Sequence, residues 1–505
     1  MEKENGMKID CGGGKTVGEA LREQKALFTP CGGRGICGKC KVRTLGGSWA
    51  PPTEEEKRLL SEEELAQGVR LACQARGRGI CEAEVLWIPG EMHILGAGEE
   101  RAFDLLREDM RGKYGFAADL GTTTAVVQVW GPEGALLGEA AGPNPQQRFG
   151  GDVISRVQSA LQGHAEELRR LAAGCLKGLL EKACRKAGVS PASLAEGVVV
   201  GNTAMLTLLA GVSPRGLSAF PFEPEEYFGR WYSGEELGLC GGDSRVYLPR
   251  CAASYVGADA VAAVVAAGLD RPGPVRLLAD IGTNGEMFLA AEGRLLCCST
   301  AAGPAFEGGG ISCGMPGTDG AISRVFLREG KVVWESLGGG APAGVCGSGL
   351  LDAAAAWKHL GFLDGTGLLL EGGEPVSRRE IGDSGVCLTQ KDIRNLQLAK
   401  SAIRAGMDTL LLRAGTKAEQ VETLYLAGGF GTRLDPASAG AIGLIPPALA
   451  ERSVAMGNGA LRGAAAILLG RGMRERAREA AENAVHLELA ADPDFMDCYM
   501  ENMMF

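Results

Sequence analysis

The chain has 505 residues and a formal net charge of −10. That length suggests two to four domains, and the acidic balance argues against nucleic-acid binding, which needs clustered Lys and Arg. No stretch reaches the ~18 uninterrupted apolar residues of a membrane-spanning helix, and the first ten residues carry no apolar signal region. We therefore expect a cytoplasmic protein that binds neither nucleic acid nor membrane.

The sixteen cysteines need an interpretation other than disulfide bonds, because cytosolic thiols stay reduced. Four of them have the spacing of metal ligands: Cys31, Cys37, Cys40 and Cys73. We expect the other twelve to be inert core residues, since a free cysteine packs as a small hydrophobe. The four histidines fall in no motif, which argues against a His-based catalytic triad.

Short helices and strands surround the four spaced cysteines. Thr16 with Glu19 predicts a capped helix to about residue 24, and Thr53 with Glu56 predicts a second, acidic helix to about Ala66. Strands are expected around Val42 and over residues 80–88. The Gly-rich loop 31–40 carries three of the cysteines, and the fourth follows the acidic helix.

The spacing of these cysteines predicts a 2Fe–2S cluster. Four thiolates complete two tetrahedral irons that share two sulfides. Three ligands on one loop require a tightly curled backbone, and glycine permits it because it tolerates positive φ. Structural zinc is the alternative, but zinc sites usually pair two C-x2-C knuckles, and this loop has one, preceded by C-x5-C.

This segment resembles the plant-type and adrenodoxin-type ferredoxins, which have a β-grasp fold. The resemblance implies a ferredoxin domain over residues 1–88. It departs from the family at the start, because only residues 7–10 precede the first helix, so a strand of the opening hairpin is expected to be missing or shortened. Residues 89–113 are interpreted as a linker, with a short helix near residues 102–110.

The rest of the chain repeats itself. Ala118-Asp119-Leu-Gly-Thr recurs as Ala279-Asp280-Ile-Gly-Thr, an offset of 280 − 119 = 161 residues. Each copy is an apolar strand, a Gly turn and another strand. A second pair, 198–203 and 424–431, is in each case a buried strand followed by glycine and a helix. Two similar halves with a shared cleft explain both pairs.

The repeated turns have the chemistry of a nucleotide cleft. A Gly turn flanked by Thr presents backbone N–H groups and hydroxyls to a phosphate, and Asp119 and Asp280 are placed to hold Mg2+ directly or through water. The later Gly-Gly-Phe-Gly would let backbone approach an adenosine.

This pattern resembles the superfamily of acetate and sugar kinases, heat-shock chaperones and actin, over about residues 114–470. It implies a multidomain α/β protein with two RNase H-like halves, 114–270 and 271–505, the second including the C-terminal tail. By position, the resemblance assigns Asp119 with Gly121, Thr122, Thr123 and Thr124 to the first phosphate motif; Asp280 with Gly282, Thr283, Asn284 and Gly285 to the second; and Gly428, Gly429, Phe430 and Gly431 to the adenosine motif.

Weaker signals leave alternatives open. Asp152 either positions the attacking water or Mg2+, or caps a helix. The loop 302–310 is a mobile gate, a partner surface or a plain loop. Ser348 is expected to be a helix N-cap rather than a nucleotide contact. Lys400 lies on a helix over residues 390–407, and the superfamily resemblance places it near the ribose; a solvated helix face is the alternative. The Met-rich tail, 494–505, is expected to pack on the core.

An ATP cleft and a 2Fe–2S ferredoxin on one chain resemble the reductive activators of corrinoid proteins over the full length. The stretches that carry the resemblance are 31–42, 70–74, 119–124, 302–308 and 426–431. The family implies an ATP-hydrolysing iron–sulfur reductase that returns cobalt(II) to cobalt(I) for a methyltransferase system in anaerobes, with an external low-potential electron donor.

Two other functions are kept as alternatives. One is an ATP-dependent electron donor similar to the activators of 2-hydroxyacyl-CoA dehydratases, although those share a 4Fe–4S cluster. The other is a non-enzymatic redox-sensing module that binds ATP. The sequence leaves the oligomeric state open, with a homodimer as one option.

Overall fold

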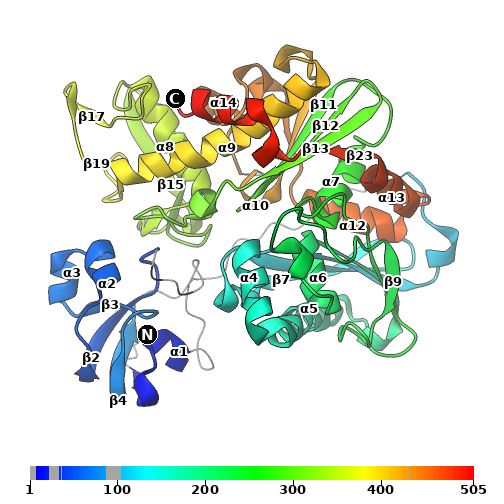
Figure 1. Cartoon of the computed structure of the whole chain (residues 1–505), viewed down its shortest axis with the longest axis horizontal. Helices are drawn as coiled ribbons and strands as arrows, with labels where there is room; N and C mark the ends of the chain where they lie inside the picture. The colour runs from blue at the N-terminus through cyan, green and yellow to red at the C-terminus, as the bar shows by residue number, and fades with distance from the viewer. Residues whose placement is uncertain (1–6, 22–32, 34, 36, 87–103, 432) are drawn as a thin grey trace.

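The computed structural model describes residues 7–21, 33, 35, 37–86, 104–431 and 433–505. Three parts follow one another along the chain: an N-terminal module and the two halves of a larger body (Figure 1). None of the helices within these ranges is long and apolar enough to span a bilayer.

The N-terminal module is a four-stranded sheet in the order β1-β4-β2-β3. Its strands are β1 (Met7–Asp10), β2 (Lys41–Trp49), β3 (Val69–Leu71) and β4 (Gly77–Val85), and its helices are α1 (Val17–Leu21), α2 (Glu54–Leu59) and α3 (Glu62–Ala66). The opening strand is short, as expected, and β1 pairs antiparallel with the closing strand β4.

The prediction of a single acidic helix between Thr53 and Ala66 is wrong, because the structure has two helices there. Thr53 and Ser61 each accept a backbone N–H in a complete capping box. Between them Leu60 and Ser61 are extended, with ψ of 147° and 159°. The second capping box restarts the helix in a new direction, because an N-cap residue itself adopts a non-helical conformation.

The first half of the body has a six-stranded sheet in the order β7-β6-β5-β8-β10-β9. Its strands are β5 (Tyr114–Leu120), β6 (Thr124–Trp130), β7 (Leu136–Pro143), β8 (Leu194–Gly201), β9 (Arg230–Ser233) and β10 (Arg245–Leu248). Its helices are α4 (Val153–Ser159), α5 (Ala165–Ala187), α6 (Thr203–Ala210) and α7 (Ala258–Ala267).

The second half has a six-stranded sheet in the order β22-β21-β11-β12-β13-β23. Its strands are β11 (Arg276–Ile281), β12 (Gly285–Ala291), β13 (Arg294–Thr300), β21 (Thr423–Ala427), β22 (Ser453–Ala455) and β23 (Ala484–His486). Its helices are α8 (Gly347–His359), α9 (Gln390–Ala414), α10 (Gly428–Gly431), α11 (Pro436–Ala441), α12 (Gly459–Leu469), α13 (Met473–Asn483) and α14 (Pro493–Glu501).

Smaller sheets decorate the second half. A three-stranded sheet joins β14 (Ala321–Arg328), β15 (Lys331–Ser336) and β16 (Gly344–Val345). Two hairpins pair β17 (Leu370–Glu371) with β18 (Glu374–Pro375) and β19 (Arg378–Glu380) with β20 (Cys387–Thr389).

The strand pairing confirms the internal repeat. In the first half β5 pairs antiparallel with β6 and parallel with β8; in the second half β11 pairs antiparallel with β12 and parallel with β21. Asp119 lies opposite Val200 on β8, and Asp280 lies opposite Ala427 on β21. The two aspartates therefore hold equivalent positions at equivalent strand ends.

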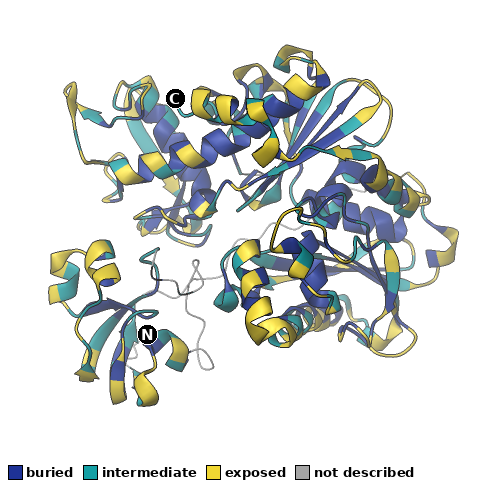
Figure 2. Cartoon of the chain, in the orientation of Figure 1, coloured by how far each residue is buried: buried dark blue, intermediate teal, exposed yellow. Residues whose placement is uncertain are grey.

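Helix α12 joins the two halves. It follows β22 in the second half, yet it packs on α7 and on β5 and β8 of the first half. Its buried side chains, such as Leu461 and Ile467, belong to the same apolar core as the first sheet. Figure 2 shows α12 and the strands beside it as buried, between helices with exposed outer faces.

Residues 104–113, which fall in the expected linker, pack against the body. A 3-10 turn spans Glu108–Met110. The Arg107 guanidinium donates to Glu196 at 3.0 Å, and the Arg107 N–H donates to the carbonyl of Leu469 at 2.7 Å. Glu196 is buried and Leu469 belongs to the core of the first sheet, so this end of the connector is fixed to the first half.

The α7–α12 crossing is close enough to require glycine at one position. A Cβ on Gly463 would lie 2.0 Å from the carbonyl oxygen of Ala262. We expect Gly463→Ala to lower the free energy of unfolding by about 1–3 kcal/mol through overpacking, measured as a fall in the thermal midpoint. Gly174→Ala is the control: it lies in helix α5 with open space around its Cβ position, so it should raise stability by about 1 kcal/mol. Equal midpoints for the two variants would contradict this crossing.

Candidate functional site

The two Gly-Thr turns lie at equivalent ends of the two sheets. Residues Gly121–Thr123 connect β5 to β6, and Gly282–Asn284 connect β11 to β12. Each turn follows directly on a strand that carries an aspartate in its last two residues. These turns bring together the residues that the sequence assigned to phosphate binding.

The first turn is held by the loop 144–147 and by Arg156. The amide of Asn144 donates to the Gly121 carbonyl, and that of Gln147 donates to the Thr123 carbonyl, both at 2.8 Å. The buried guanidinium of Arg156 donates to the carbonyl of Thr122 at 2.5 Å. The carbonyls of Gly121, Thr122 and Thr123 are therefore all hydrogen-bonded, which fixes the backbone of the turn.

Glu307 links the two turns. Thr283 Oγ1 donates to Glu307 Oε2 at 2.5 Å, and Thr123 Oγ1 donates to Oε1 at 3.4 Å. Burial raises the pKa of this carboxyl, against the opposing effect of the Thr283 and Thr123 hydrogen bonds. One carboxylate thus contacts a hydroxyl from each half. The sequence placed Glu307 only in a loop of open function, so the structure gives that loop a specific position.

Four acidic side chains gather beside these turns: Asp119, Asp259, Asp280 and Glu286. Burial raises the pKa of Asp119 to about 6, and burial together with the charge of Asp119 raises that of Asp280 to about 7. Burial and the charges of Asp119 and Asp280 raise the pKa of Asp259 to about 8. These carboxyls therefore lie close enough for the charge of one to influence the pKa of the others.

Amide side chains from both halves meet this acidic group. Asn458, at the start of α12, donates to Asp119 Oδ2 at 2.9 Å, and Asn202, at the start of α6, donates to Glu286 Oε1 at 3.4 Å. Each bond joins residues from different halves of the sequence. The acidic group is therefore part of the contact between the halves.

The Gly-Gly-Phe-Gly segment forms the short helix α10 at the end of β21. Gly428 has φ of 86°, and a Cβ there would lie 2.6 Å from Asp280 Oδ1. Phe430 stacks on Phe306, with ring centroids 4.4 Å apart. The backbone of this segment therefore borders the second phosphate turn, while the Phe430 ring is buried against the loop that carries Glu307.

Three other predicted residues have well-defined contacts. Asp152 is the N-cap of α4 and accepts the Ser155 N–H at 2.8 Å. Ser348 is not an N-cap: it lies inside α8, whose N-cap is Cys346, and donates to the Ser323 carbonyl at 2.8 Å. Lys400 is fully buried, and its ammonium donates to the carbonyls of Asn502 and Met504, each at 2.6 Å. The Lys400 ammonium is therefore already hydrogen-bonded to the C-terminal tail, which does not favour a contact with the ribose.

In the N-terminal module Cys40, at the end of the cysteine-bearing loop, contacts Cys73. The pKa of the Cys40 thiol is raised, mainly by its hydrogen bond with the Cys73 thiol and secondly by burial. The charge of Cys37 contributes to the same rise. Gly33, Gly35 and Gly38 all have positive φ, of 82°, 71° and 68°, as the curled loop requires. Cys31 lies outside the described residues. Among the described residues, no group of three or more His, Cys, Asp or Glu side chains is arranged to hold a metal ion.

A buried ion pair fixes the strand that precedes Cys73. Arg70 on β3 donates to both carboxylate oxygens of Glu56 on α2, at 3.0 and 2.7 Å. The Leu71 N–H donates to the same carboxylate at 2.9 Å. Helix α2 therefore sets the position from which the fourth cysteine leaves the sheet.

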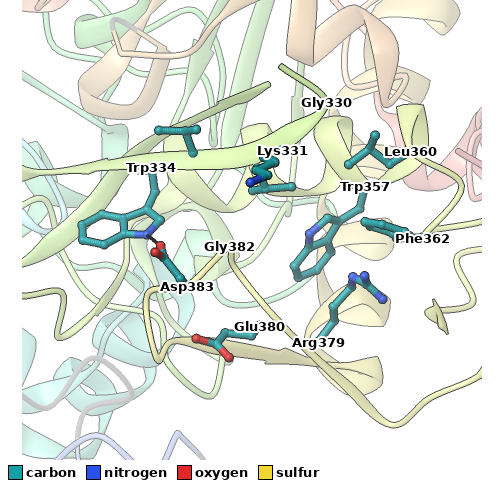
Figure 3. Close-up of a pocket in the computed structure, with 12 residues that line it drawn as sticks. Gly330, Lys331, Trp334, Trp357, Leu360, Phe362, Arg379, Glu380, Gly382 and Asp383 are labelled. Atoms are coloured by element: carbon teal, nitrogen blue, oxygen red, sulfur yellow. Dashed lines mark hydrogen bonds between the residues drawn. The ribbon is translucent and has the colours of Figure 1, made fainter. Parts of the chain in front are cut away.

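A separate pocket of 690 Å³ lies in the second half, among β15, the end of α8 and the β19 hairpin (Figure 3). Trp334 Nε1 donates to Asp383 Oδ1 at 3.0 Å, and the Arg379 guanidinium lies 3.6 Å from the centroid of the Phe362 ring. None of the residues predicted for ATP or iron binding lines it, so we do not assign it to the nucleotide site.

Comparison with known proteins gives the same three-part division. Family models match over residues 2–77 (2Fe-2S iron-sulfur cluster binding domain), 114–272 (RACo middle region) and 274–505 (C-terminal domain of RACo, the ASKHA domain). The corrinoid activation enzyme RamQ of Eubacterium limosum is 32% identical over 84% of this chain and 76% of its own length. The chain belongs to the RACo family of corrinoid activators.

Two further comparisons agree. The [Co(II) methylated amine-specific corrinoid protein] reductase of Methanosarcina barkeri is 30% identical over 55% of this chain and 53% of its own length. A solved reductive activator for corrinoid, iron-sulfur protein is 29% identical, with a TM-score of 0.70 over 97% of this chain and 95% of that one. The expected fold, a ferredoxin domain followed by an ASKHA body, is confirmed.

For a RACo protein, the match to the 2Fe-2S family decides between the two metals considered for the cysteines. It favours the iron–sulfur cluster over zinc, and Cys40 and Cys73, two of the four predicted ligands, are in hydrogen-bonding contact. The ASKHA match likewise supports ATP as the ligand of the body.

The titration of the acidic group gives a test in the nucleotide-free RACo protein. The folded-state pKa values of Asp119 and Asp280, about 6 and about 7, lie above the ordinary value of 3.8. The folded state therefore holds protons that the unfolded state has lost, and stability falls as the pH rises from about 4 to about 7.

We expect the thermal midpoint, measured with EDTA, to fall between about pH 4 and pH 7. Asp280→Asn should make this fall smaller, because the amide has the same shape and does not ionise. Asp104→Asn, at an exposed site, should leave the pH dependence unchanged. Parallel curves for wild type and Asp280→Asn would show that Asp280 does not titrate in this range.

Proposed function

We propose that this protein reductively activates a corrinoid protein at the expense of ATP, returning inactive cobalt(II) to cobalt(I) for a methyltransferase system. The observation that carries the proposal is the presence, on one chain, of a ferredoxin module and of two phosphate turns linked through Glu307. The named relatives act on corrinoid proteins, which supports a corrinoid protein as the partner.

The N-terminal module supplies the electron. When bound, a 2Fe–2S cluster accepts and donates one electron at a time. Cys31, Cys37, Cys40 and Cys73 would be its four ligands. The amide of Gln74 lies 3.8 Å from Cys73 Sγ, and such contacts to ligand sulfur tune the potential of a cluster. An external low-potential donor would reload it.

ATP is needed because the electron moves uphill. For a one-electron couple, each ~59 mV of unfavourable gap costs a factor of ten in equilibrium. A ferredoxin-type donor alone would leave little cobalt(I). Hydrolysis in the body would shift the balance by changing the arrangement of the two halves around the bound partner.

The cleft residues divide the work of binding ATP. N–H groups and hydroxyls of Gly121–Thr124 and Gly282–Gly285 would contact the phosphates, except the Gly282 N–H, which donates to the Asn284 carbonyl at 2.9 Å. The Gly428–Gly431 backbone would border the adenosine. Mg2+ in nucleotide sites is held by one or two carboxylates together with phosphate oxygens. Asp119 and Asp280 would supply those carboxylates, and a bound cation would in turn favour ionisation of their neighbours Asp259 and Glu286, whose pKa values burial raises.

Glu307 would orient the attacking water. It is the carboxylate that contacts Thr123 and Thr283 at once, so it lies where the phosphates held by the two turns would converge. A carboxyl whose pKa burial raises toward the working pH is suited to accept a proton. Asp152, the earlier candidate for this role, has one carboxylate oxygen committed to the α4 cap.

The electron-transfer proposal predicts formation of cobalt(I). Anaerobic mixing of reduced protein, a cobalt(II) corrinoid partner and Mg-ATP should produce the cobalt(I) spectrum and release phosphate. A non-hydrolysable ATP analogue should give no sustained turnover, because binding alone cannot drive an uphill step repeatedly. Equal accumulation of cobalt(I) with the analogue over many turnovers would remove ATP as the driving force.

The cleft assignment predicts which substitutions stop hydrolysis. Asp119→Asn, Asp280→Asn and Glu307→Gln should each lower phosphate release by about 10²–10³-fold, comparable to the loss of one preorganised electrostatic contact. Iron content and the visible spectrum should stay unchanged, since the cysteines lie in another module. Asp352→Asn is the control: Asp352 is a buried acid of α8 that accepts the Val325 N–H at 3.2 Å, away from the phosphate turns. Near-normal hydrolysis in the first three variants would refute the assignment.

A further inference from the structure

The loop that carries the iron ligands contacts the second half of the body through Lys39. This lysine lies between Cys37 and Cys40, and its ammonium donates to the carbonyls of Ser312, at 2.9 Å, and Gly314, at 2.7 Å. Both bonds join residues more than 270 positions apart. In Figure 1 the blue N-terminal module lies next to the yellow-green part of the second half. Lys39 therefore docks the cluster loop on the body.

The turn that receives Lys39 is held from the other side by helix α9. The Ser312 N–H donates to Asp392 Oδ1 at 2.7 Å, and the Ser312 hydroxyl donates to the other oxygen of the same carboxylate. Asn395 on the next part of α9 donates to the Gly310 carbonyl at 2.7 Å. The two carbonyls that accept from Lys39 are thus presented by a fixed turn rather than by a loose loop.

The same turn touches the backbone next to Glu307. A Cβ on Gly314 would lie 2.4 Å from the carbonyl oxygen of Gly308, and a Cβ on Gly308 would lie 2.5 Å from the N of Met315. Glycine at both positions lets the two backbones approach this closely. A shift of Glu307 therefore moves Gly308, and Gly308 has no free space in which to move past Gly314.

These contacts form a short physical connection from the phosphate turns to the cluster loop. Thr123 and Thr283 contact Glu307, Gly308 contacts Gly314, and Gly314 binds Lys39. We propose that Lys39 is a positioning residue that holds the cluster loop docked in the nucleotide-free protein, and that ATP binding weakens this hold. The proposal rests on the proposed function in one respect, namely that ATP occupies the two phosphate turns.

The direction follows from charge. The hydroxyls of Thr123 and Thr283 donate to Glu307 in the nucleotide-free protein and would donate to phosphate oxygens once ATP is bound. The Glu307 carboxylate would then face the phosphate charge without its two donors. Repulsion would move it back far enough to leave room for the attacking water between the carboxylate and the phosphates. This movement displaces Gly308 and with it the Gly314 carbonyl, so one of the two acceptors of Lys39 shifts. The cluster loop is therefore released toward the corrinoid partner when the body binds ATP.

Because coupling between two binding equilibria is reciprocal, the docked lysine must in turn oppose nucleotide binding. We expect Lys39→Met to lower the dissociation constant of a non-hydrolysable Mg-ATP analogue by about fivefold or more, the low end of typical couplings. Methionine keeps the apolar stem, so packing along the loop is preserved while both hydrogen bonds are lost. Lys39→Arg should restore the wild-type value, since the guanidinium also donates to two carbonyls.

The experiment uses the full chain loaded with iron, without a corrinoid partner, and has two readouts. Calorimetry gives the dissociation constant of the analogue, and electron paramagnetic resonance of the reduced cluster reports its surroundings. In wild type the spectrum should change when the analogue binds. In Lys39→Met the nucleotide-free spectrum should already match the nucleotide-bound wild-type spectrum and should not respond to the analogue.

Lys41→Met is the matched control. Lys41 is two residues away on β2, and its ammonium pairs with Glu64 inside the N-terminal module. It should behave as wild type in both readouts. A second variant, Asp392→Asn, loosens the receiving turn without touching the cluster loop, and it should shift the dissociation constant in the same direction as Lys39→Met. It keeps the test available if Lys39→Met fails to load iron.

The results that would overturn the proposal are distinct from failure of the proposed function. If Lys39→Met and Asp392→Asn bind the analogue as wild type does, or more weakly, the coupling is wrong while ATP-driven cobalt reduction stands. A wild-type spectrum that does not respond to bound analogue has the same meaning. If the wild-type protein binds no nucleotide, the proposed function fails and the coupling fails with it.

Discussion

The crowding of carboxyl groups at the boundary of the two halves is the constraint on which the body depends. Asp119 and Asp280 occupy equivalent strand ends because the halves are repeats, and burial together with the charge of Asp119 raises the pKa of Asp280. Charged groups that are partly removed from water need partners. Here Asn458 and Asn202 supply donors from the opposite half, and a cation with its nucleotide would complete the neutralisation. The chemistry that suits the site to Mg-ATP also holds the halves in an incompletely satisfied contact.

Loop 302–315 turns this local constraint into communication along the chain. Its first part stacks Phe306 on Phe430 of the adenosine motif, its middle places Glu307 between the phosphate turns, and its end presents carbonyls to Lys39. Three parts of the molecule that are distant in sequence thus contact one continuous segment of fourteen residues. This segment therefore cannot move without affecting both the nucleotide turns and the cluster loop.

The parts that could be predicted from sequence are those encoded in consecutive residues. The Asp-x-Gly-Thr turns, the Gly-Gly-Phe-Gly segment and the cysteine spacing are local patterns, and the repeat revealed which strands correspond. Asp259, Glu286 and Asn458 were missed because they reach the cleft only through folding: one begins a helix, one lies in a strand, and one caps a helix from the other half. No local pattern marks them.

Other differences arose from competition between local signals. The Ser61–Glu64 capping box was present in the sequence beside the one at Thr53, and it broke a helix that propensity alone would continue. Lys400 shows the opposite case: its helix was predicted, but the hydrogen bonds of its ammonium to the tail carbonyls depend on where residues 502–504 return to the body.

The position of α12 has a consequence for how the protein is made. The core of the first half, whose strands begin at residue 114, includes buried side chains of α12 such as Leu461, Ile467 and Leu468. A ribosome adds about 5–20 residues per second, so the surface that α12 covers emerges long before the segment that covers it. Throughout that interval the nascent first half presents apolar surface to its surroundings. Its completion is therefore a late event of synthesis, and the two halves mature together rather than one after the other.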